Sequence, residues 1–202
     1  MAKYIICAIC IVAWVYLLTV LKRAKLQWWT FLVGAFGEFI FLMILVRPLV
    51  TEAFARAVAA IAAIVGNVTG TFDAFLKYGT IFIDSAYGAI TLQIDFECSG
   101  VIEIMAFISL LTFFVVYTKA ERVIVSLLGV LIIMLSNALR IIIICEMIYF
   151  RGPSVYYVAH TLVGRIVFYV LTVLLYFFVF TKPHIVRMKI GKFSYGNNKQ
   201  ST

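Results

Sequence analysis

Three residues that could share an acyl-transfer reaction lie far apart along the chain: a thiol (Cys98), a guanidinium (Arg140) and an imidazole (His160). A thiolate can attack a carbonyl carbon, an imidazole can carry the proton, and a guanidinium can stabilise the oxyanion that forms. Each also has a simpler role, as an apolar filler, a snorkelling cation or a hydrated surface group. The chemistry therefore depends on whether the fold brings the three side chains to one place.

The amino-acid composition indicates which kind of fold could bring these side chains together. Of the 202 residues, 65% are apolar and 13% are charged. Soluble domains contain about 45–50% apolar and about 25% charged residues. A chain with so little polar surface cannot be a soluble enzyme. Because its apolar residues fall in long blocks, the sequence predicts an all-α polytopic membrane protein.

Five apolar blocks approach the length of about 20 residues that crosses a bilayer. The first block is followed by basic residues, whereas a cleavable signal peptide is preceded by them, so we expect it to be retained. The tail after the last block reads as a flexible cytoplasmic end, 191–202, beyond a single domain, 1–190. The expected spans cover about 4–21, 28–46, 100–118, 123–145 and 160–180.

Lysine and arginine in the short loops set the orientation of a membrane protein. With five spans, the basic loops and the tail lie on one side, which is then cytoplasmic, and the N-terminus lies outside. The net charge of +8 is therefore a topology signal, and we expect no nucleic-acid partner. The residues on the cytoplasmic side are Lys22, Arg23, Lys25, Lys119, Arg122, Lys182, Arg187, Lys189, Lys192 and Lys199.

Residues 47–97 then form an outer cap between the second and third spans. Apolar residues at helical spacing, beside Glu52 and Arg56, predict an interfacial helix that lies on the bilayer. A sixth span is the alternative, but the run Ala57–Gly66 is too short to cross. The residues with helical spacing are Phe54, Val58, Ile61 and Val65.

Further along the cap, apolar and polar residues alternate from Ala89 to Phe96, which predicts a half-buried strand. Ile81 and Ile83 precede it across a turn-forming segment. We therefore expect a short β-hairpin that leads directly into Cys98.

This topology places Cys98, Arg140 and His160 at the same outer face. From Val123 to Arg140 a helix rises about 25 Å, which ends just beneath the surface of a core about 30 Å thick. Glu103 follows Cys98 by five residues and Arg165 follows His160 by five. The two are expected at similar depth, either as an ion pair that supports the site or as one that only joins two helices.

These motifs resemble the exosortase/archaeosortase family over roughly residues 80–175. The resemblance consists of Cys98-Ser99-Gly100 opening a span, Asn137 and Arg140 as Asn-x-x-Arg in the next, and His160 opening the last. The short chain is most similar to the compact Gram-positive G-type group. The resemblance implies a membrane cysteine transpeptidase or protease with Cys98, Arg140 and His160 as catalytic residues. Supporting residues are then Asn137, Ser99, Glu103 and Arg165.

The resemblance also implies the partners. The substrate is a membrane-anchored protein with a C-terminal sorting signal, made of a short motif, a membrane span and a basic tail. The acceptor is a lipid, a glycan or water, and the site faces the outside of the cell membrane. No cofactor is expected, because two histidines, of which His184 lies in the cytoplasmic tail, cannot build a zinc site.

Two other functions remain open: a small membrane transporter and an assembly subunit without catalysis. Charges inside the spans, at Glu38, Glu103 and Arg165, favour the transporter. Against it, these charges follow no repeated or broken-helix pattern. A Cys98→Ala variant distinguishes these functions, because it abolishes the activity of a cysteine enzyme and leaves the activity of a transporter intact.

Overall fold

The computed structural model describes residues 2–96 and 98–183; the predicted tail 191–202, His184 and Glu97 lie outside them. The described chain is mostly helical. Its α-helices are α1 (Ala2–Arg23), α2 (Gln27–Phe41), α3 (Arg47–Thr69), α4 (Val101–Phe113), α5 (Lys119–Arg151) and α6 (Gly164–Tyr176). Its π-helical and 3₁₀ turns are η1 (Leu42–Val46), η2 (Pro153–Val155), η3 (Val158–Val163) and η4 (Phe177–Thr181). Its strands are β1 (Asp73–Phe75), β2 (Thr80–Ser85) and β3 (Gly88–Gln93).

Within the described residues, three continuous helical stretches are long and apolar enough to cross a membrane: Gln27–Thr69, Lys119–Arg151 and Val158–Thr181. This confirms a helical membrane protein, while the count of five spans stays a prediction. The span predicted at 100–118 is too long, because α4 ends at Phe113, where the backbone of Phe114 becomes extended. A second helix then starts at the Thr118–Glu121 capping box and runs unbroken to Arg151, beyond the predicted end at 145.

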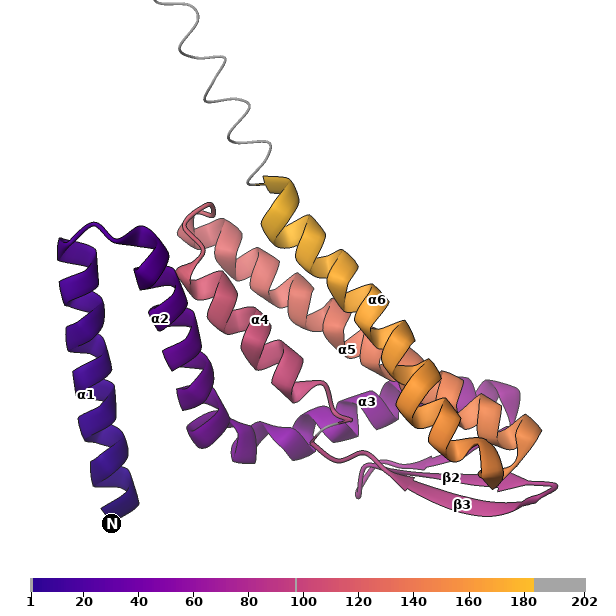
Figure 1. Ribbon diagram of the computed structural model, residues 1–202. Coiled ribbons are helices and arrows are strands. Elements are labelled where there is room, and N and C mark those ends of the chain that lie inside the picture. Colours follow the sequence, from indigo (N-terminus) through magenta and orange to yellow (C-terminus); the bar gives the residue numbers. More distant parts are fainter. Residues whose placement is uncertain (1, 97, 184–202) are drawn as a thin grey trace, which may run out of the picture.

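The expected interfacial helix exists as α3, but its environment differs from the prediction. The π-helical turn η1 joins it to α2, and Figure 1 shows α3 turning away from α2 to run toward the sheet. Its apolar face is buried in protein, since Val58, Ala59 and Ala62 have no exposed surface. The face that was expected on the bilayer packs instead on α5 and β1. It belongs to one apolar cluster with the isoleucines of β2 and α5, so it is shielded by protein.

The cap contains a three-stranded antiparallel sheet in the order β1-β2-β3. The predicted hairpin is present, with Ser85 opposite Gly88 and with Ile81 and Ile83 fully buried. Two details were wrong: β1 forms a third strand, and β3 ends at Gln93 instead of Phe96. The chain leaves the sheet there because it must carry Cys98 to the start of α4.

Two apolar clusters fill the molecule. One joins the sheet, α3 and the second half of α5, and includes Cys98. The other joins α4, α5 and α6 around Phe107 and Phe168. At Gly129 a Cβ would lie 2.2 Å from the Phe107 ring, so glycine lets α4 approach α5 closely.

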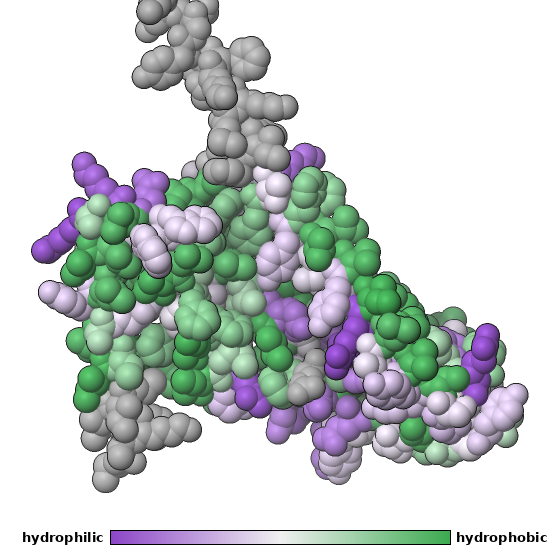
Figure 2. All heavy atoms as spheres, viewed as in Figure 1, coloured by the Kyte–Doolittle hydropathy of each residue, from purple (hydrophilic) through white to green (hydrophobic). Residues whose placement is uncertain are grey.

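The two ends of the molecule differ. Figure 1 shows the α1–α2 loop, the α4–α5 loop and the end of the last helix at one end, and the sheet at the other. Hydrophobic atoms cover most of the helical surface between them in Figure 2, and a hydrophilic patch interrupts them beside α6. The basic loops therefore lie together, opposite the sheet.

Candidate functional site

Cys98 lies in the connection between β3 and α4, and its backbone is held on both sides. Its N–H donates to the Asp95 Oδ1 atom at 3.1 Å, and its carbonyl accepts a short hydrogen bond from the Asn137 side chain. Gly100 caps α4 with φ +76, a left-handed conformation that a side chain would strain, and the Asn137 Cβ lies 3.5 Å from where a Cβ would stand. These contacts fix where the thiol points.

The structure brings the three predicted residues together. The Cys98 Sγ atom lies 3.1 Å from the His160 Nε2 atom, and an Arg140 guanidinium nitrogen lies 4.0 Å from the same sulfur. Cys98 is 7% exposed and Arg140 is 6% exposed. A thiol beside an imidazole, with a buried guanidinium near the sulfur, is an arrangement that can support nucleophilic acyl transfer.

His160 stands on the π-helical turn η3, at the start of the last membrane stretch. The Tyr156 ring stacks on the imidazole, with ring centroids 5.4 Å apart and planes 25° apart. Tyr156 was missed at the sequence level, although a spacing of four residues on a helix places two rings on one face. The stacked ring restricts the imidazole to an orientation facing Cys98.

Arg140 lies against α6, next to Phe168 and Gly164. Its guanidinium carbon lies 5.9 Å from the centre of the Phe168 ring, and a Cβ at Gly164 would stand 3.2 Å from its Cγ atom. Its Nε atom is buried and has no hydrogen-bond partner among the described residues. The guanidinium therefore has a donor left for a group that enters the site.

The other predicted supporting residues have mixed outcomes. Asn137 contacts Cys98 directly, and the Ser99 hydroxyl donates to the Phe96 carbonyl at 3.0 Å, which shapes the turn before α4. Glu103 and Arg165 line one cavity, yet no ion pair joins them within the described chain. The predicted pair is therefore wrong: equal depth fixes height along two helices, but it does not fix the direction of either side chain.

Two cavities, each of about 250 Å³, meet at Cys98 and His160. The outer cavity lies against β3 and is lined by Ile90, Thr91, Leu92, Gln93, Ile94, Cys98, Ile141, Ile144, Tyr156 and His160. The inner cavity lies among α4, α5 and α6 and is lined by Cys98, Ile102, Glu103, Arg140, His160, Arg165, Phe168 and Tyr169. The thiol is thus reachable from the sheet side and from the helix side.

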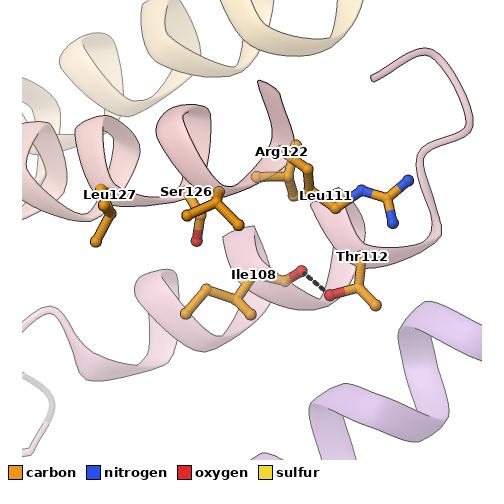
Figure 3. A pocket seen from close by; sticks show the side chains of 7 residues that line it. Ile108, Leu111, Thr112, Arg122, Ser126 and Leu127 are labelled. Carbon is orange, nitrogen blue, oxygen red and sulfur yellow. Dashed lines mark hydrogen bonds between the residues drawn. The ribbon is translucent and has the colours of Figure 1, made fainter. Parts of the chain in front are cut away.

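A further hollow between α4 and the start of α5 has a different character. Among the described residues that line it, Arg122 alone is charged, and Figure 3 shows its side chain pointing toward the loop between the two helices. There it donates to the Phe114 carbonyl at 3.1 Å. None of the predicted site residues lines this hollow.

These features define a class: a helical membrane protein with a half-buried cysteine–histidine pair at the end of its bundle opposite the basic loops. Within that class the chain belongs to the transmembrane exosortase family, whose model matches residues 1–177. The match confirms the resemblance and extends it well beyond residues 80–175. No curated protein and no solved structure matches the chain. The G-type assignment stays a prediction.

Proposed function

We propose that the protein is a cysteine transpeptidase or protease that cleaves a C-terminal sorting signal at the outer membrane face. The observation that carries the proposal is the distance of 3.1 Å between the Cys98 Sγ and His160 Nε2 atoms. Membership of the transmembrane exosortase family supports the same chemistry. The proposed catalytic residues are Cys98, His160 and Arg140.

The proposed reaction has two steps. His160 takes the thiol proton, and the Cys98 sulfur adds to the scissile carbonyl, whose oxyanion accepts hydrogen bonds from Arg140. The C–N bond then breaks, the amine leaves with the proton from His160, and a thioester remains on Cys98. Water, or a lipid or glycan acceptor, gives a proton to His160 and attacks the thioester. The C–S bond breaks, and the sulfur recovers a proton from His160.

The two cavities support a substrate that crosses the site from sheet to helices. The peptide outside the membrane would occupy the outer cavity, and the membrane helix that follows would lie along α4 and α6. The basic loops at the far end support a cytoplasmic location for that end and an extracytoplasmic site. Lipid and protein would then exclude water from the reacting carbonyl, which strengthens the effect of Arg140.

The test uses an exported protein of the same cells whose C-terminus carries a short motif, a span and a basic tail. We expect Cys98→Ala to abolish its cleavage and the matched Cys10→Ala, on the exposed surface of α1, to retain it. Mass spectrometry of the trapped acyl-enzyme should find the peptide on Cys98. Full cleavage by Cys98→Ala would refute the proposal and favour a transporter.

A further inference from the structure

The strand that borders the outer cavity is an edge strand. The sheet order is β1-β2-β3, and among the described residues β3 pairs with β2 alone. An edge strand presents backbone N–H and C=O groups that can pair with another extended chain.

The register shows which groups of β3 are free to pair. The Ile94 N–H donates to the Gly79 carbonyl at 2.9 Å, which continues the ladder in which Leu92 faces Ile81 and Ile90 faces Ile83. Antiparallel ladders alternate between residues that bond to the neighbour and residues that do not. The backbone groups of Ala89, Thr91 and Gln93 therefore point away from β2.

This free edge lies on the cavity that contains the thiol. Ile90 to Ile94 all line the outer cavity together with Cys98 and His160. At the other end of the strand, a Cβ on Gly88 would stand 3.9 Å from the Pro153 side chain, so η2 lies against that end. The accessible part of the edge is the part that leads toward Cys98.

We infer that β3 binds the main chain of its substrate as an added strand, with Thr91 and Gln93 as the pairing residues. The ligand is an extended polypeptide segment whose scissile carbonyl is directed to the Cys98 sulfur. The inference rests on the proposed function and adds how the substrate is held. Main-chain pairing supplies affinity that is independent of sequence.

The opposite wall indicates the side chains that would be accepted. It carries Ile141, Ile144 and the Tyr156 ring, all on the cavity that β3 borders. In an added strand, alternate side chains point to opposite faces. A small or apolar side chain next to the scissile bond fits this wall, whereas a charged one would be desolvated without a partner.

The experiment compares two electrophiles on the full chain in detergent micelles. Chloroacetone and tetra-alanyl chloromethyl ketone both lose chloride and form a thioether with the Cys98 sulfur, but only the second has a peptide main chain. Mass spectrometry measures the rate of each, and the ratio of the two rates reports main-chain binding. Thr91→Pro removes an outward N–H from the edge, where proline is tolerated.

The matched control is Ala74→Pro, on the opposite edge of the same sheet. Ala74 faces Ile81, and since Ile81 bonds to β3, the Ala74 N–H also points outward. We expect Thr91→Pro to lower the rate ratio by roughly threefold to tenfold, the worth of one hydrogen bond. We expect Ala74→Pro to leave the ratio unchanged.

A second probe leaves the protein intact. Tetra-alanyl chloromethyl ketone with N-methylated amides should lose the same advantage on the unsubstituted chain. An unchanged ratio for both Thr91→Pro and the N-methylated probe would overturn strand addition, while leaving the thiol chemistry in place. Failure of chloroacetone to label Cys98 would instead overturn the proposed function.

Discussion

At the scale of single residues, Arg140 is the least ordinary group in the site, because it is a buried cation without an ion pair in the described chain. If it stabilises an oxyanion, its planar fork of donors matters more than its charge. We expect Arg140→Lys to lower the cleavage rate by about 10²–10³, the worth of an oxyanion donor. Single-turnover cleavage of the sorting-signal protein measures this, and near-normal cleavage would reduce Arg140 to a packing residue.

His160 has a different expected signature, because its proposed role is to move a proton. We expect His160→Ala to lose roughly two to four orders of magnitude in rate. Tyr157→Ala is the matched control, since Tyr157 is 73% exposed and lies three residues away on the same segment. The rate of acyl-enzyme formation, measured by mass spectrometry, distinguishes the two variants. Equal rates for both variants would contradict a proton-transfer role.

Depth along the helices was enough to predict that Cys98, Arg140 and His160 gather, because helix rise and the basic loops fix height. Depth was not enough to predict which side chains contact one another. The Glu103–Arg165 pair failed because rotation about each helix axis is set by packing, which the sequence does not state. Tyr156 could have been found from the sequence, because its spacing of four residues from His160 on one helix does not depend on how that helix is rotated.

At the scale of elements, Gly164 lets α6 approach α5 beside Arg140. A Cβ there would stand 2.9 Å from the Ile144 side chain and 3.1 Å from the Ala159 carbonyl oxygen. We expect Gly164→Ala to destabilise the protein by about 1–3 kcal/mol, the usual cost of overpacking. It should also displace Arg140 and lower cleavage. Thermal unfolding in detergent measures the loss of stability. The control is Val170→Ala, on the exposed face of α6.

The sheet provides a second prediction at this scale. Ile94 is 4% exposed and packs in the cluster that contains Cys98. Ile94→Asp should be strongly destabilising because it buries a charge without a partner. Ala89→Asp, on an exposed position of β3, should be mild. Equal unfolding temperatures for the two variants would mean that the sheet does not pack as described.

The sequence indicated most elements but not how they join. The hairpin was predicted from alternation, whereas β1 has only three residues, too few for alternation to be recognised. The second span is predicted to end at 46, just before Arg47-Pro48, yet proline also suits the first turn of a helix, and α3 starts at that point. The π-helical turn before it has no composition of its own, so the bend could not be predicted.

At the scale of the whole molecule, the ends of the chain's helices sort by charge. The α1–α2 and α4–α5 loops lie at one end, and the sheet lies at the other (Figure 1). Lys25 lies in the first loop and Arg122 in the first turn of α5, whereas Cys98 and His160 line the cavity beside β3. Since positive loops stay in the cytoplasm, the site should face outward, where a sorting signal arrives after export. The loop charges thereby support the proposed extracytoplasmic location of the site.

The topology prediction tests that connection. In a variant with the four native cysteines replaced by alanine, single cysteines would be placed at Lys25 and at Tyr87, which is 71% exposed on the sheet hairpin. A membrane-impermeant maleimide added to intact cells should label Tyr87→Cys and spare Lys25→Cys until the membrane is opened. Labelling of both from the outside would place the basic loops and the sheet on one side. That result would contradict a bundle that crosses the bilayer between them, and with it an outward-facing thiol at the membrane surface.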